Sequence, residues 1–155
     1  MKAEQLMTRD VCTCSQYDSL ERAAHVMWNS DVGCLVVTDT EQRPIGMITD
    51  RDVAMAAYIQ NALLRDARVA SAMASNVLTC SPTTSLSDLE NTMRTAQVRR
   101  IPVVDSNGTL VGIVTLGDIA RSAQSSALRM TEIPGLAKTL AGITERRLFD
   151  VAAAQ

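Results

Sequence analysis

The chain has 155 residues, of which 46% are hydrophobic and 21% are charged, and its formal net charge is −2. This composition is typical of a folded globular protein and argues against disorder. Aromatic residues make up only 3% of the chain, so it offers no set of rings on which single-stranded nucleic acid could stack. The net charge of −2 supplies no basic surface for a polyanion. We therefore expect no nucleic-acid partner.

The N-terminal residues 1–5 contain no apolar run and do not resemble a secretory signal. No segment approaches the roughly 18 consecutive apolar residues that cross a bilayer. The four cysteines lack zinc-finger spacing and His25 is the single histidine, so we expect reduced thiols and no metal site. These features predict a cytoplasmic protein without a membrane partner.

The first half of the chain predicts the order strand, helix, strand, strand, helix. A β-prone stretch at 11–14 leads through a turn rich in serine and threonine to a helix with apolar residues at helical spacing. Two aliphatic strands follow at 35–37 and 45–48, joined by a hairpin turn, and a second helix begins near Asp50. The first helix is expected to bury a stripe that consists of Leu20, Ala23, Ala24, Met27 and Trp28.

The second half repeats this order. A β-prone stretch at 77–80 precedes a helix, and strands at 101–104 and 110–114 are joined by a turn with the hairpin signal Asn107-Gly108. The last helix of the unit begins near Leu116. The buried stripe of its first helix consists of Leu86, Leu89 and Met93.

An offset of 66 residues aligns Met7–Asp52 with Met73–Asp118 without a gap. Self-similarity of this kind predicts two copies of one α/β unit. We expect the first unit at 7–66, with its connecting helix, and the second unit at 67–123.

Residues 124–155 have no counterpart in the repeat and are expected to form a helical C-terminal tail. Pro134-Gly135 predicts a break before the final helix. One side of that helix carries apolar residues, so it packs either on the flank of its own domain or in a dimer contact. We favour the flank. The apolar residues are Leu136, Leu140, Ile143 and Leu148.

The motif Gly-x-x-Thr-x-x-Asp occurs at the same strand–helix junction in both copies, with Thr49 and Asp52 in one and Thr115 and Asp118 in the other. One interpretation is structural: each threonine is an N-cap and each aspartate its capping-box partner. The other is functional. A helix N-terminus attracts an anion, and a carboxylate one turn later can accept hydrogen bonds from ribose hydroxyls.

The repeat, the strand Ile101–Asp105 and the paired motif resemble the cystathionine-β-synthase (CBS) domain in its tandem arrangement, the Bateman module. The resemblance implies two βαββα units packed through their sheets as a pseudo-twofold pair, with two clefts. Such pairs commonly bind AMP, ADP, ATP or S-adenosylmethionine, and occasionally a dinucleotide such as NAD, without an obligatory cofactor. The family generally forms homodimers, so the resemblance also implies a homodimer.

The resemblance assigns roles to particular residues of this chain. It implies that Asp52 and Asp118 bind the ribose hydroxyls and that Thr49 and Thr115 lie beside the ribose or phosphate. It also implies that the backbone at two β-prone stretches contacts the adenine edge. These stretches contain Val11 and Cys12 in the first copy and Val77 and Leu78 in the second.

Two arginines, Arg99 and Arg100, precede the Ile-Pro-Val strand, where many nucleotide-binding members of the family bind phosphate with basic residues. On the residues alone they are equally well explained as solvated arginines at a strand end. The first copy has Gly33-Cys34 at this position and lacks the following proline. We therefore expect one competent cleft and one weak or empty one.

The sequence offers few candidates for catalysis, because His25 is expected on a helix surface and no nucleophile–base arrangement is apparent. We expect a non-catalytic regulatory module that binds an adenosine-containing ligand. It would act through conformation, oligomeric state or an unknown effector protein. The alternative is a ligand-free scaffold for dimerisation or protein contact.

Overall fold

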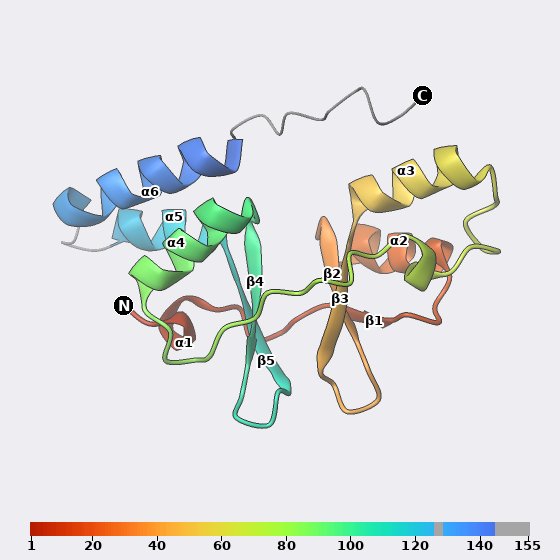
Figure 1. Cartoon of the computed structure of the whole chain (residues 1–155), viewed down its shortest axis with the longest axis horizontal. Coiled ribbons are helices and arrows are strands. Elements are labelled where there is room, and N and C mark those ends of the chain that lie inside the picture. Colours follow the sequence, from red (N-terminus) through yellow and green to blue (C-terminus); the bar gives the residue numbers. More distant parts are fainter. Residues whose placement is uncertain (126–128, 145–155) are drawn as a thin grey trace.

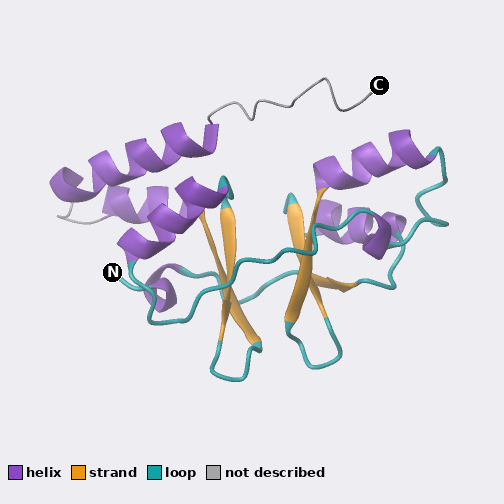
Figure 2. Ribbon diagram, viewed as in Figure 1, coloured by secondary structure: helices purple, strands orange, loops and turns teal. Residues whose placement is uncertain are grey.

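The computed structural model describes the backbone of residues 1–125 and 129–144, with side chains at 1–122 and 135–143. Two similar α/β units lie side by side, with hairpins β2–β3 and β4–β5 adjacent at the centre and helices on both flanks (Figures 1 and 2). This arrangement confirms the predicted α/β pair with a C-terminal helix. No helix in the described ranges is long and apolar enough to span a membrane.

The first unit contains β1 (Thr13–Ser15), α2 (Leu20–Asn29), β2 (Cys34–Thr38), β3 (Pro44–Thr49) and α3 (Asp50–Gln60). Its sheet has the order β1-β2-β3, in which β1 is parallel and β3 antiparallel to β2. The N-cap of α2 is a serine whose hydroxyl accepts a hydrogen bond from a backbone N–H of the first turn, which fixes where the helix starts.

The second unit contains α4 (Leu86–Ala96), β4 (Arg100–Val104), β5 (Leu110–Thr115) and α5 (Leu116–Ser125), preceded by the short 3₁₀ helix η1 (Val69–Ser71). The β4–β5 pair is antiparallel, with the same register as β2–β3. The two hairpins are therefore built alike, as the 66-residue offset requires.

The strand predicted at 77–80 is wrong, because this stretch makes only an isolated parallel bridge between Cys80 and Val103. In the first unit, Val36 donates its N–H to the Cys12 carbonyl at 3.2 Å. The equivalent position in the second unit is Pro102, which has no N–H to donate. One ladder hydrogen bond is thus missing, and the second sheet has two strands.

The two units are connected by reciprocal contacts. Met7 packs over Gly112, and Met73 packs over Gly46; a Cβ on Gly46 would lie 2.7 Å from the Met73 sulfur. Isolated bridges also pair Thr8 with Ile113 and Met47 with Ala74. Each strand glycine therefore leaves room for a methionine from the other unit.

Each unit has its own buried core, built mainly from aliphatic and methionine side chains. The short helix α1 (Ala3–Leu6) belongs to the second core although it begins the chain. In α2, the predicted burial of Leu20, Ala23 and Met27 is confirmed, but that of Trp28 is wrong, because Trp28 is 86% exposed. Leu20, Ala23 and Met27 lie on one face of the helix. Trp28 comes one residue after Met27, so its side chain is rotated by about 100° around the helix axis, away from that face.

The C-terminal helix α6 spans Arg129–Thr144, so the break predicted at Pro134-Gly135 is wrong. It packs on α4 and α5 (Figure 1). These contacts with α4 and α5 stabilise the helix through Pro134, because tertiary packing can override the low helix propensity of proline. Ile143 is buried in the second core and Leu136 packs against it, whereas Leu140 remains 43% exposed. Leu148 lies outside the described residues.

Candidate ligand-binding cleft

A cleft of about 330 Å³ lies between the two units. The first unit contributes the segment 8–12, which leads from the bridge with Ile113 to β1, and the turn 31–34 before β2. The second unit contributes the start of β4, the end of β5 and the first turns of α5. A ligand in this cleft would therefore contact both units.

Five of the ten predicted ligand-binding residues line this cleft, and five do not. Those that line it come from both units and are Val11, Cys12, Arg100, Thr115 and Asp118. Those that lie elsewhere are Thr49, Asp52, Val77, Leu78 and Arg99.

Thr115 and Asp118 are joined by a reciprocal set of hydrogen bonds at the start of α5. The Thr115 N–H and hydroxyl each donate to Asp118 Oδ2 at 2.7 Å, and the Asp118 N–H donates to Thr115 Oγ1 at 3.2 Å. This is the capping-box arrangement that the motif allowed. It uses one carboxylate oxygen, Oδ2, and leaves Oδ1 for another partner.

That partner is Arg121, a cleft residue that the sequence analysis missed. Its guanidinium donates to Asp118 Oδ1 and lies over Gly117. The side chain of Arg121 is 71% exposed, whereas that of Asp118 is 8% exposed. The i,i+3 spacing within α5 was a signal for this pair. A second signal was the 66-residue offset. The equivalent position of the first unit is Met55, so Arg121 is a charged residue that only one copy has.

Arg100 extends from the second unit toward the first. Its guanidinium lies beside Gly33: a Cβ built on that glycine would be 3.6 Å from Arg100 Nη2 and 3.3 Å from Asp50 Oδ2. Burial raises the pKa of the Cys34 thiol, and the nearby charge of Arg100 partly opposes that rise. Arg99 does not line the cleft: it lines an adjoining hollow beside the start of α5, which shares Arg100 and Thr115 with the cleft.

The motif of the first unit has the same cap without the arginine. The Thr49 N–H and hydroxyl donate to Asp52 Oδ2 at 2.9 and 2.7 Å, and the Asp52 N–H donates to Thr49 Oγ1 at 3.2 Å. Met55 stands where the second unit has Arg121. The two copies of the motif therefore have different neighbours on the helix that follows.

The cleft of Asp118 combines groups suited to hydroxyls and to anions. Arg100 and Arg121 supply two guanidinium groups, and Thr115 supplies a hydroxyl at a helix N-terminus. Asp10, Asp31 and Asp118 supply carboxylates that can accept hydrogen bonds from sugar hydroxyls. Such a mixture fits a polar ligand with a hydroxylated part and an anionic part.

The single histidine of the chain lies away from the cleft. His25 lies on the exposed side of α2, with Nε2 at 2.9 Å from the Asn29 side-chain amide. Within residues 1–122 and 135–143, no group of three or more His, Cys, Asp or Glu side chains is arranged to hold a metal ion. No nucleophile–base pair is recognisable in the cleft.

Comparisons with known proteins give matches that cover both units. The model of the CBS domain matches residues 3–58 and 69–125. The CBS domain-containing protein YhcV of Bacillus subtilis is 38% identical over 123 residues, which are 77% of this chain and 84% of YhcV.

Two solved structures have the same fold. The crystal structure of Hypoxic Response Protein I with two coordinated zinc ions has a TM-score of 0.71 and 30% identity, and the match covers 78% of this chain and 98% of that one. The CBS domain pair of protein MJ0100, in complex with 5′-methylthioadenosine and S-adenosyl-L-methionine, has a TM-score of 0.71 and 25% identity. The coverage is 79% of this chain and 98% of that one. Since the two family matches coincide with the two structural units, the chain belongs to the CBS-domain family, as a tandem CBS pair.

Proposed function

We propose that this CBS pair is a non-catalytic regulatory module that binds an adenosine-containing ligand of the AMP, ADP or ATP class in the cleft of Asp118. The single observation that carries the proposal is that residues of both units line one cleft. A ligand held by both units stabilises their bound arrangement and shifts the population toward it. The MJ0100 pair, whose structure contains two adenosine derivatives, supports the adenosine part.

In the proposed complex the adenine edge lies against the backbone at Val11 and Cys12, and the ribose hydroxyls donate to Asp118 Oδ1. In the free protein this oxygen accepts from Arg121. Ribose binding would therefore release the Arg121 guanidinium, which is free to move because its side chain is largely exposed.

The released Arg121 and Arg100 would then bind the phosphate groups. Arg100 and Arg121 can bind phosphate through their N–H donors, so we place AMP, ADP and ATP first. S-adenosylmethionine and NAD follow them, because the cleft also holds the carboxylates of Asp10, Asp31 and Asp118. The cleft of Asp52 lacks the equivalent of Arg121, and we propose that it is weak or empty.

The signal would pass to an effector protein or through a homodimer. The four cysteines are free, which fits a reducing cytoplasm. A ligand-free scaffold is the second candidate. It is favoured by the capping boxes, because they explain the Thr-x-x-Asp motif in both units without any ligand.

A thermal-shift series with AMP, ADP, ATP, NAD and S-adenosylmethionine separates the two candidates. A ligand at about 100 times its dissociation constant stabilises the fold by about 2.7 kcal/mol, which raises the melting temperature by several degrees. A melting temperature that none of these ligands moves at millimolar concentration would favour the scaffold.

Replacing Arg121 by methionine, the residue of the first unit at this position, tests the proposed exchange of partners. Because a hydrogen bond to a charged group contributes about 1.5–3 kcal/mol, we expect Arg121→Met to weaken ATP binding about 10- to 100-fold. Adenosine binding should stay equal or improve, since Asp118 Oδ1 is freed. Isothermal titration calorimetry measures both affinities.

Arg22→Met is the matched control, because Arg22 is similarly exposed, at 68%, and pairs with an aspartate in the i,i+4 position. It should leave both affinities unchanged. An equal loss of ATP and adenosine binding in Arg121→Met would contradict a role for Arg121 in phosphate binding.

A further inference from the structure

A hollow of about 440 Å³ adjoins the ligand cleft, and its lining comes from the second unit and α6. It shares Arg100 and Thr115 with the cleft, so the two cavities have one boundary in common. We call it the α5/α6 hollow. The other residues that line it are Arg99, Leu116, Gly117, Ala120 and Leu140.

The α5/α6 hollow is mainly aliphatic, whereas the cleft is lined by several charged groups. Leu116 and Ala120 are half-buried and lie four residues apart, so they belong to the same strip of α5. Leu140 of α6 lines the same hollow and is 43% exposed. These side chains offer apolar surface that a ligand can remove from water.

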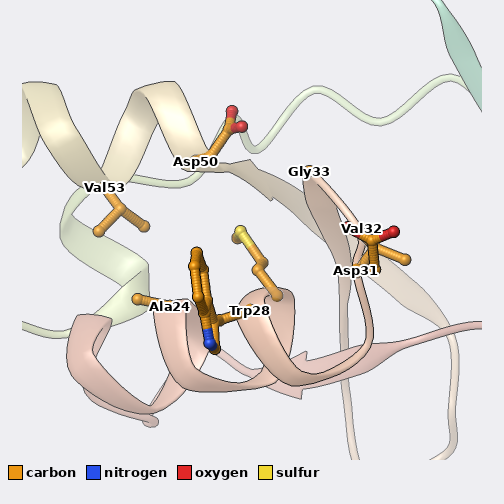
Figure 3. A pocket seen from close by; sticks show the side chains of 8 residues that line it. Ala24, Trp28, Asp31, Val32, Gly33, Asp50 and Val53 are labelled. Carbon is orange, nitrogen blue, oxygen red and sulfur yellow. The ribbon is translucent and has the colours of Figure 1, made fainter.

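The first unit has charged residues where the second has this aliphatic surface. The 66-residue offset places Asp50 at the position of Leu116 and Arg51 at the position of Gly117. Figure 3 shows Asp50 at the start of α3, on a different hollow that Asp31 also lines. The aliphatic surface therefore adjoins the motif of the second unit, which is the motif that lines the cleft.

We infer that the ligand of this chain is an adenosine 5′-phosphate that carries an aliphatic group on its phosphate, and that the α5/α6 hollow binds this group. The inference rests on the proposed adenosine site. With the ribose at Asp118, the phosphate lies at the shared boundary, where Arg100 supplies guanidinium donors. A substituent on that phosphate leads into the hollow, against Leu116 and Leu140.

An aliphatic group suits this hollow better than further phosphate groups do. Among the residues that line the hollow but not the cleft, Arg99 is the single charged one, and the others are leucine, alanine and glycine. Phosphate oxygens placed against leucine would lose hydrogen bonds to water without replacing them. An aliphatic chain in the same place gains free energy from its burial.

Isothermal titration calorimetry of the full chain with AMP, adenosine 5′-(methyl phosphate) and adenosine 5′-(hexyl phosphate) tests the inference. The two esters carry the same charge and differ only in the length of the aliphatic chain. We expect the hexyl ester to bind about tenfold more tightly than the methyl ester, which corresponds to the burial of about two methylene groups.

Leu140→Gln removes the apolar side chain from the hollow without adding a charge, and glutamine is a good helix former. It should reduce the difference between the two esters to less than about threefold and leave the affinity for the methyl ester unchanged. Leu63→Gln is the matched control, because Leu63 is 58% exposed and lines neither cavity. It should keep the full difference.

The hollow also places α6 beside the ligand, and hydrogen exchange provides a second measurement of that contact. An aliphatic group between Leu116 and Leu140 would touch α5 and α6 together and stabilise their packing. Amide exchange in residues 136–143 should therefore be slower with the hexyl ester than with the methyl ester when both saturate the chain. Equal exchange rates in the two complexes would contradict the contact with α6.

The calorimetric outcomes separate this inference from the proposed function. If AMP binds but the two esters bind the wild-type chain equally, the inference fails and the proposed function stands. If AMP and both esters fail to bind, both fail. A preference for the hexyl ester that persists in Leu140→Gln, or that Leu63→Gln loses to the same extent, would overturn the assignment of the aliphatic group to the α5/α6 hollow.

Discussion

At the scale of single residues, the Thr-x-x-Asp motif caps a helix with one oxygen of its carboxylate and leaves the other oxygen for a second partner. Oδ2 of Asp118 closes the cap, while Oδ1 is held by a largely exposed arginine. Asp52 makes the same cap without that arginine. The structural and the ligand-binding interpretations of the motif are therefore compatible. A comparison of variants at Asp52 and Asp118 can separate the contribution of the cap from that of ligand binding.

We expect Asp52→Ala and Asp118→Ala to lower the free energy of unfolding by similar amounts, about 1 kcal/mol each, because each removes one capping interaction. Urea denaturation without ligand measures both. A loss confined to Asp118→Ala would show that the Arg121 pair, and not the cap, supplies the stability.

The cysteine thiols give a second test at this scale. Burial raises the pKa of Cys14 and of Cys80 to about 11, so both thiols are protonated almost completely at pH 8. Because the thiolate is the reactive form, alkylation by iodoacetamide should accelerate steadily from pH 8 to pH 10 without reaching a plateau. Peptide mass spectrometry follows each cysteine, and a plateau below pH 9 would contradict the raised pKa.

At the scale of elements, the contacts between the two units depend on the strand glycines. The neighbour of each glycine is a methionine of the other unit, which no local sequence pattern could show. A Cβ on Gly112 would lie 2.5 Å from the Met7 sulfur and 2.9 Å from Met7 Cγ.

Gly112→Ala should therefore destabilise the fold by about 1–3 kcal/mol, the usual effect of overpacking. Adding Met7→Ala should recover part of that loss, because it removes the side chain that the new methyl group meets. Thermal or urea unfolding of the single and double variants measures the coupling. Simply additive losses would show that the strain arises elsewhere.

The elements also show where sequence reasoning succeeds and fails. Periodicity located the helices and hairpins, because burial of one face has a regular spacing. It misjudged Trp28, since periodicity does not show where the buried stripe ends. It missed the consequence of Pro102 for the stretch 77–80, because a ladder hydrogen bond depends on the neighbouring strand. The helix through Pro134 depends on packing against α4, which is a long-range contact.

At the scale of the whole molecule, the two units have the same fold and different surroundings. The pattern of the second unit singled out Thr115 and Asp118, but it did not show that Val11 and Cys12 of the other unit line the same cleft. It did not separate Arg100, which begins β4 and lines the cleft, from Arg99, which lies just before β4 and does not, because that difference depends on the segments around the cleft. The two units therefore contribute differently to the cleft: the second supplies Arg100, Asp118 and Arg121, and the first supplies Asp10 and Asp31.

Calorimetric titration of the wild-type chain and the two aspartate variants with ATP tests this account most directly. We predict one site per chain, abolished in Asp118→Ala and retained in Asp52→Ala. Two equivalent sites, loss of binding in Asp52→Ala, or full binding in Asp118→Ala would contradict it.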